Sequence, residues 1–206
     1  MFNLSIQEIL IFVPVLVFSF SIHELCHGLT AYKLGDITAK RDGRLSLNPI
    51  RHIDPIGLLC ILIVGFGWAK PVMVDHRNLK NPKIGMGLIA AAGPLANFVM
   101  AFMLMLVLYP LADGLPAIAA SALSYGIFIN IVLGVFNLLP LPPLDGSKII
   151  AALIPDKFYT KLPPNIDRIS MAVFLLLILT GALGRILGPL VERVLWFMAS
   201  VIQRIF

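Results

Sequence analysis

Residues 84–112 read IGMGLIAAAGPLANFVMAFMLMLVLYPLA and contain no Asp, Glu, Lys or Arg. A second charge-free stretch, residues 114–144, follows after the turn sequence DGLP at 113–116. About 20 apolar residues are enough for a helix to cross the roughly 30 Å hydrocarbon core of a bilayer. We therefore predict an antiparallel pair of membrane-spanning helices over about 84–109 and 117–138, and this pair decides the fold class.

The composition of the whole chain agrees with a membrane protein. Of 206 residues, 59% are hydrophobic and 13% are charged, against roughly 45–50% and 25% in soluble domains. This balance excludes a soluble globular enzyme and a disordered chain. The net charge of +5 comes from basic residues scattered through short loops. Because they form no basic stripe with interleaved aromatic residues, we expect the lipid bilayer as a partner and no nucleic acid.

Two further stretches predict membrane spans. Residues 4–34 are long enough, although they carry Glu8 near one end and three ionisable residues in their second half. Residues 169–187, bounded by Arg168 and Arg185, have nearly the minimum spanning length. We therefore expect an all-α polytopic membrane protein with about four spanning helices.

The C-terminal stretch, residues 189–206, begins at Gly188-Pro189 and has polar side chains about seven or eleven residues apart. This spacing forms a polar stripe on a helix, so we expect an interfacial amphipathic helix in preference to a short span. The sequence does not determine its side of the membrane. We treat 1–206 as one membrane-embedded domain, with a core of about 4–154 and C-terminal helices of about 166–206.

Residues 55–69 form an apolar stretch that is too short to span and contains three glycines and several β-forming residues. Residues 33–83, which include this stretch, hold nine basic residues, and the later segment 145–168 holds four. The positive-inside rule therefore places segments 34–83 and 145–168 in the cytosol. The two segments lie on the same side of the membrane only if residues 55–69 do not cross it. Irregular backbone survives at membrane depth only where protein or water satisfies it, so we predict a re-entrant, β-like element here.

The polar residues of the first span form the pattern His23-Glu24-Leu25-Cys26-His27. On a helix the two imidazoles lie one turn apart on the same face, which suits two ligands of a tetrahedral zinc ion. Glu24 flanks that face, where a carboxylate can act as the general base of a hydrolysis. The alternative is that these residues hold helices together or relay protons, but one metal explains all three together.

A catalytic zinc needs a third protein ligand, and Asp145 is the best candidate. It follows the second charge-free span directly, after a proline-rich linker at 138–144. The prolines prevent the helix from continuing and favour an extended backbone that carries Asp145 beside the first helix. Gly146 then permits a close approach. An alternative is that Asp145 caps a short helix beginning near Ser147, and the two roles are compatible.

Three motifs in this order resemble those of the site-2 protease family of intramembrane zinc metalloproteases. They are HExxH at 23–27, GPLAN at 93–97 and NLLPLPPLDG at 137–146. The resemblance covers roughly residues 4–154. It is to a minimal form of the family: no soluble stretch exceeds about 50 residues, so we expect no PDZ or CBS domain.

The resemblance implies roles for particular residues. His23, His27 and Asp145 would hold one zinc ion per chain, and Glu24 would be the general base. Asn137 would help to position the substrate or its oxyanion. Asn97 would be either a helix–helix hydrogen-bonding residue or part of the substrate region. The β-like element, extended to 55–74, would offer an edge to an unwound substrate.

The function that we expect is hydrolysis of peptide bonds within or near transmembrane segments of membrane proteins. The protein would be a multi-pass protein of the cell membrane with its active site nearer the cytosolic side. Two other classes remain as alternatives: a non-catalytic membrane protein that binds or transports metal, and a proteolytically silent membrane adaptor. Neither alternative requires a base at Glu24 beside two histidine ligands. Substrate and oligomeric state do not follow from the sequence.

Overall fold

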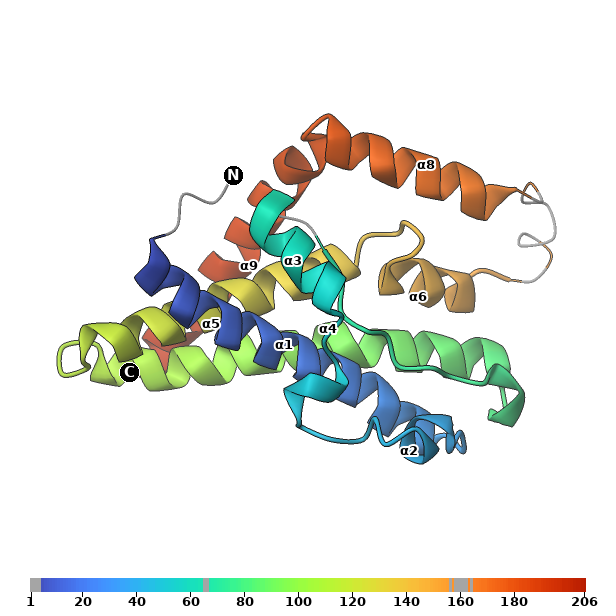
Figure 1. Ribbon diagram of the computed structural model, residues 1–206, viewed down its shortest axis with the longest axis horizontal. Coiled ribbons are helices and arrows are strands. Elements are labelled where there is room, and N and C mark those ends of the chain that lie inside the picture. Colours follow the sequence, from blue (N-terminus) through green and yellow to red (C-terminus); the bar gives the residue numbers. More distant parts are fainter. Residues whose placement is uncertain (1–4, 65–66, 156, 158–162, 164) are drawn as a thin grey trace.

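The computed structural model describes residues 5–64, 67–155, 157, 163 and 165–206. Four of its helices are long and apolar enough to cross a membrane. They are α1 (Ile6–Lys33), α4 (Pro82–Leu111), α5 (Ala117–Asn137) and α9 (Ala182–Ile205) (Figure 1). The shorter elements are α2 (Thr38–Arg41), η1 (Pro49–Arg51), α3 (Pro55–Val64), η2 (His76–Asn78), α6 (Asp145–Leu153) and α8 (Ile166–Leu179).

Local signals start the two longest helices. Ser5 and Glu8 form a reciprocal capping box at the beginning of α1, which explains why a charge stands near this end. Asn81 accepts a hydrogen bond from the Ile84 amide, and Pro82 occupies the first position of α4. The predicted spans over 4–34, 84–109 and 117–138 therefore agree with the observed helices.

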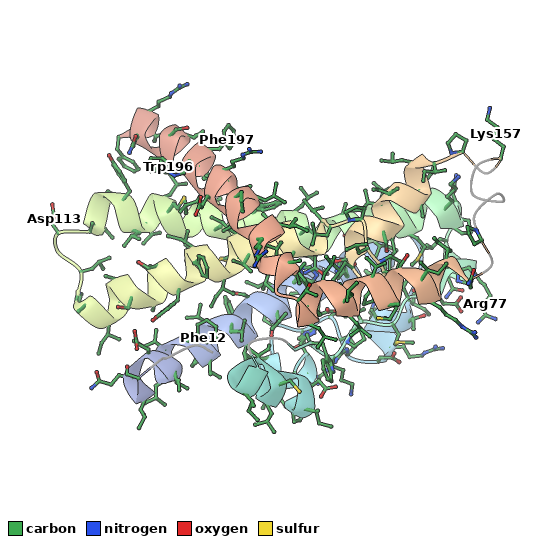
Figure 2. All side chains as sticks on the ribbon, turned by 90° about the horizontal axis from the view of Figure 1, so that it is seen from above. Phe12, Arg77, Asp113, Lys157, Trp196 and Phe197 are labelled. Atoms are coloured by element: carbon green, nitrogen blue, oxygen red, sulfur yellow. The ribbon has the colours of Figure 1, made fainter. Side chains whose placement is uncertain are left out.

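The core lies where α4 and α5 pack against each other and against α1 and α9. Ala101 of α4 and Ile131 of α5 are completely buried, and they share a cluster with Val191 and Ile202 of α9. Large apolar side chains remain exposed on the outer faces of the spanning helices, among them Trp196 and Phe197 on α9 (Figure 2). A bilayer is the environment in which so apolar an outer surface is stable.

The two ends of the helix bundle differ in their charged residues. Asp113, in the turn between α4 and α5, marks one end, whereas Arg77 and Lys157 mark the opposite end (Figure 2). Phe206 stacks on Tyr109 with 5.7 Å between ring centroids, so the C-terminus lies at the Asp113 end. The segments that follow α1 and α5 thus share one end, as the loop charges predicted.

The structure corrects the expected β-like element. Residues 55–64 form the α-helix α3, while 65–66 lie outside the described residues. The Asp54 carboxylate accepts hydrogen bonds from the amides of Ile56 (2.9 Å) and Gly57 (3.2 Å), and Pro55 stands at the first helical position. This N-terminal helix signal outweighs the β-propensity of the residues that follow.

Helix α3 packs against the spanning helices and, with ten residues, is too short to cross a membrane. The buried Ile61 packs with Phe12 and Leu16 of α1 and with Leu133 of α5. The chain then returns through residues 67–75, which have no regular secondary structure, to η2. The segment is therefore re-entrant in its path, although it is helical where a β-like element was expected.

The fourth spanning helix also differs from the prediction. Helix α8 has only 14 residues and ends at Thr180, and Gly181, with φ of 68°, separates it from α9. Helix α9 has 24 residues and continues through Pro189. The expected span over 169–187 is wrong, and residues 189–206 belong to the fourth candidate span, not to a separate interfacial helix. The break falls at Gly181 because a glycine adopts this left-handed conformation without strain.

Candidate metal centre

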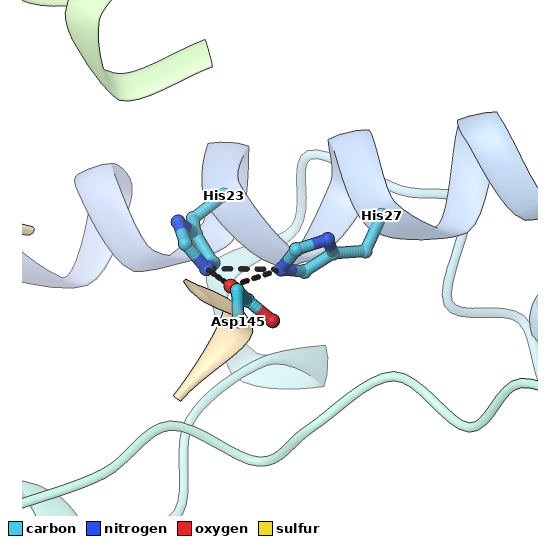
Figure 3. A group of neighbouring side chains, drawn as sticks. All are labelled: His23, His27 and Asp145. Carbon is cyan, nitrogen blue, oxygen red and sulfur yellow. Dashed lines mark hydrogen bonds and ion pairs between the residues drawn. The ribbon is translucent and has the colours of Figure 1, made fainter. Parts of the chain in front are cut away.

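Three predicted ligands meet at one point inside the bundle. His23 and His27 project from α1 toward Asp145, the first residue of α6 (Figure 3). The two Nε2 atoms are 3.0 Å apart, and Oδ2 of Asp145 lies 3.2 Å from Nε2 of His23 and 3.1 Å from Nε2 of His27. All three side chains are buried.

In each histidine, Nδ1 forms a hydrogen bond with α4 that holds the imidazole ring in place. Nδ1 of His27 lies 2.6 Å from the backbone oxygen of Ile89 on α4. Because a carbonyl oxygen only accepts, Nδ1 of His27 carries a proton, and in the neutral ring Nε2 is then the unprotonated nitrogen. Nδ1 of His23 lies 2.6 Å from Oδ1 of Asn97, also on α4. Partners of this kind orient metal-binding histidines in other proteins.

The three converging atoms fit a zinc ion. Unprotonated Nε2 atoms and a carboxylate oxygen repel one another at about 3 Å unless a cation or a proton lies between them. Zinc binds such atoms at about 2.0–2.2 Å, and tetrahedral angles then separate neighbouring ligands by about 3.3 Å. The observed separations of 3.0–3.2 Å are close to that value. Two histidines and one carboxylate also leave the fourth position open, as a catalytic zinc site requires.

Glu24 lies beside this trio, on the wall of the same cavity. Its Oε2 accepts a hydrogen bond of 2.8 Å from the amide of Val72, in the segment that follows α3. That segment is itself held by Arg44, whose buried guanidinium donates to the backbone oxygens of Lys70 and Pro71. The loop after α1 thus fixes the backbone that orients Glu24.

The cavity has a volume of about 290 Å³. Its walls come from α1, α4, residues 71–74 and the region from the end of α5 to the start of α6. Asn137, the last residue of α5, lines it and donates a hydrogen bond to the Leu133 oxygen. Met86 and Lys148 belong both to this cavity and to a second one, of about 360 Å³, near η2 and the beginning of α4.

Comparisons with known proteins agree with this geometry. A model described as Peptidase family M50 matches residues 115–181. A relative from Bacillus subtilis, named "Putative zinc metalloprotease YwhC", is 43% identical over 195 residues, which cover 91% of this chain and 85% of the relative. The chain belongs to peptidase family M50. The resemblance read from the three motifs is thereby confirmed.

Other relatives cover this M50 chain to different extents. Rip2 of Mycolicibacterium smegmatis, which carries the same description, is 28% identical over 87% of the chain and 69% of its own length. The zinc metalloprotease MJ0392 of Methanocaldococcus jannaschii is 29% identical over 98% of the chain and 50% of its own length. No solved structure gives a significant match.

In this M50 chain, Asp145 reaches the histidines by a route that the sequence did not predict. Residues 138–144 form a series of turns in place of an extended strand. Helix α6 begins at Asp145 itself, with Leu144 at its N-cap position and no side-chain cap. The carboxylate therefore does not cap the helix: its partners are the two histidines, with the Lys148 ammonium 3.7 Å from its other oxygen.

A glycine of the second motif lets α4 approach the ligands. A Cβ atom on Gly93 would lie 2.5 Å from Nε2 of His27 and 2.6 Å from Cε1 of His23. Real Cβ atoms do not come this close to other heavy atoms, so α4 can take this position only with a glycine at 93. The motif thus has a steric role at the metal centre.

Asn97 makes helix–helix hydrogen bonds, the first of its two predicted alternatives. Its side chain is completely buried and connects His23 to Asn130 of α5. Asn130 and Ser19 also belong to this network, and neither was predicted from the sequence. Spacing could have indicated both: Ser19 stands four residues before His23, and Asn130 stands seven residues before Asn137.

Proposed function

We propose that this chain is an intramembrane zinc endopeptidase that hydrolyses peptide bonds within or near transmembrane segments of membrane proteins. One observation carries the proposal: His23, His27 and Asp145 converge at a cavity that Glu24 also lines, among helices long enough to cross a membrane. Two histidines and a carboxylate would hold one zinc ion, with Glu24 within reach of its open side.

The chemistry divides between the metal and the chain. A bound zinc ion supplies Lewis acidity and makes water nucleophilic near neutral pH. Glu24 takes a proton from the attacking water and returns it to the leaving amine. Because the Val72 amide binds Oε2, Oε1 is the oxygen available for this proton transfer. The same amide keeps the carboxylate turned toward the cavity.

Asn137 is the proposed contact for the substrate carbonyl. It lines the cavity together with Glu24 and Asp145, and its amide nitrogen is a hydrogen-bond donor. A donor aimed at the developing oxyanion stabilises the transition state more than the substrate. The amide nitrogen of Asn137 carries two hydrogens, and the bond with the Leu133 oxygen uses one of them, so the second can be donated to the substrate.

Residues 67–75 are the proposed docking backbone for an unwound substrate. They run without regular secondary structure after α3, and residues 71–74 line the cavity. A transmembrane substrate must leave its helical form before a peptide bond is accessible. Backbone pairing with an extended segment would hold it in that form.

We propose that the active site opens toward the cytosol. His27 and His23 precede the end of α1 by six and ten residues, or about 9 and 15 Å along the helix. The neighbouring cavity, which shares Met86 and Lys148 with the catalytic one, lies at the end that carries the basic loops. By the positive-inside rule this end faces the cytosol.

The decisive experiment compares wild type with Glu24→Gln, purified in detergent, on model single-span substrates. Zinc content is measured for both, and Glu192→Gln, the same change at an exposed position of α9, is the matched control. We expect wild type and the control to cleave within the span, and Glu24→Gln to keep zinc but lose activity by at least about 100-fold. Zinc binding without cleavage of any substrate would reduce the claim to a metal site, and absence of zinc from wild type would reject it.

A further inference from the structure

A buried polar network lies between α1, α4 and α5, outside the cavity walls. Asn97 is 0% exposed, and Ser19 and Asn130 are each 1% exposed. A buried amide group without partners at membrane depth costs several kcal/mol by order of magnitude, so such groups are retained where they have a purpose. In each hydrogen bond of this network, the donor and the acceptor can be assigned.

A backbone carbonyl fixes the orientation of the Asn130 amide. The side chain lies 2.8 Å from the Gly126 oxygen, which only accepts, so the atom at this contact is Nδ2. The same nitrogen lies 2.9 Å from Oγ of Ser19, whose own proton goes to the Val15 oxygen at 2.8 Å. Oδ1 of Asn130 is therefore turned toward α4.

Asn97 takes its orientation from Asn130. Oδ1 of Asn130 lies 2.7 Å from the Asn97 side chain and requires a donor there, which is Nδ2. Oδ1 of Asn97 then faces Nδ1 of His23 at 2.6 Å. An acceptor at this position requires a proton on Nδ1. In the neutral ring Nε2 of His23 is then the unprotonated nitrogen, and it is directed toward Asp145.

We propose that Asn130 is a positioning residue of the metal centre, which acts through Asn97 to hold His23 in the tautomer that binds zinc. The two histidines differ in this respect. The Ile89 oxygen sets the tautomer of His27 directly, whereas that of His23 depends on side chains that could rotate. The inference rests on the proposed function for its zinc readout, but not for the tautomer itself.

Without Asn130, the side-chain amide of Asn97 can rotate so that its oxygen and nitrogen exchange places. Nδ2 of Asn97 then faces Nδ1 of His23, and Nδ1 must accept a hydrogen bond. The proton moves to Nε2, where it occupies the position of the metal bond. Without Asn130, the contact that still opposes this rotation is the one from Asn97 to the Ser19 oxygen, which is long at 3.4 Å.

The first test replaces Asn130 with leucine, which has similar size and no amide. We expect zinc affinity, measured by chelator competition, to fall about 10-fold, at the lower end of the range for outer partners of metal ligands. Nitrogen NMR of histidine-labelled, zinc-free protein, recorded at a pH at which His23 is neutral, should show His23 losing its single Nδ1-protonated tautomer. Ser19→Ala is the matched control: the Gly126 oxygen still orients Asn130, so both readouts should stay as in wild type.

The second test separates positioning from packing. In an Asn97→Asp background the carboxylate has no N–H end, so it accepts from His23 whichever way it turns. Asn130→Leu should then leave zinc affinity unchanged. An equal loss in both backgrounds would mean that Asn130 only packs between helices, and would overturn the proposal. Asn130→Ala serves for the same comparison if the leucine variant does not fold.

The outcomes distinguish this proposal from the proposed function. If folded Asn130→Leu keeps wild-type zinc affinity and a single His23 tautomer, Asn130 has no positioning role. If wild type itself binds no zinc, the proposed function fails. The NMR comparison of zinc-free proteins still decides the positioning role of Asn130 in that case.

Discussion

Two walls of the proposed catalytic cavity are built in different ways. The helical wall carries His23 and His27 on one long helix, and α4 holds each ring from the opposite side through neutral hydrogen bonds. The loop wall carries Asp145 and Val72 on segments outside the spanning helices, held by turns and by charged groups such as Arg44. Two of the proposed metal ligands thus depend on helix packing, whereas the third proposed ligand and the orientation of Glu24 depend on loops.

Zinc affinity should be more sensitive to a glycine-to-alanine substitution in the helical wall than to one in the loop wall. Gly93→Ala places a methyl group 2.5 Å from Nε2 of His27 and 2.6 Å from Cε1 of His23, so both ligands must move. We expect zinc affinity to fall about 100-fold, the upper end for disturbance of metal-ligand partners. Chelator competition measures the loss.

Gly184→Ala is the matched control for this prediction. Gly184 lies in α9, and a Cβ atom there would meet nothing within 4 Å. Alanine favours a helix over glycine by about 1 kcal/mol, so both variants should gain helix stability. A Gly93→Ala protein that binds zinc as tightly as the control would show that α4 does not constrain the ligands.

The same substitution in the loop wall should have a smaller effect. A Cβ atom on Gly146 would overlap the backbone oxygens of Leu138 and Leu139, so the start of α6 must shift and Asp145 must shift with it. His23 and His27 stay in place because they belong to α1. We expect Gly146→Ala to reduce zinc affinity about 10-fold in the same competition assay. A larger loss of zinc affinity in Gly146→Ala than in Gly93→Ala would show that the loop wall, and not the helical wall, is the more sensitive of the two.

The two walls also differ in how far the sequence predicts them. Hydropathy identified α1, α4 and α5, and the four-residue spacing of His23 and His27 identified their shared helix face, because both signals are local. Asp145 was found by its place after a span. The turns that deliver it, and the Val72 amide that binds Glu24, depend on contacts between distant residues and leave no local pattern.

Errors in the fold prediction have similar causes. The helix α3 was expected to be β-like because its apolar residues were weighed above the helix start at Asp54-Pro55. The fourth span was placed too early because the break at Gly181 was less conspicuous than Gly188-Pro189. The seven-residue spacing from Asn137 could have indicated Asn130, but its partners Ser19 and Asn97 belong to other helices and are known only from the packing of α5 against α1 and α4.

The smallest effect should come from Asp36, a charged residue that lies outside both walls of the cavity. Asp36 is completely buried after α1 and accepts hydrogen bonds from Thr38, from the Asn78 side chain and from the Asp75 amide. Burial alone raises the pKa of Asp36, but these hydrogen bonds together outweigh it and hold the pKa below its usual value. The ionised carboxylate thus ties the loop after α1 to the segment before α4.

The sign of the pH dependence follows from this lowered pKa. The contribution of Asp36 to stability is fully present above the unfolded pKa of about 3.9 and is lost as pH falls through the folded pKa. We expect Asp36→Asn to lower the thermal midpoint by roughly 2–8 °C at pH 7, with the difference from wild type narrowing below about pH 4. Asp42→Asn, at an exposed position in the same loop, should match wild type at both pH values. Zinc affinity at pH 7 should be unchanged in both variants, because the histidine partners lie in the helical wall. A loss of zinc in Asp36→Asn would mean that the two walls are not independent of the loop after α1.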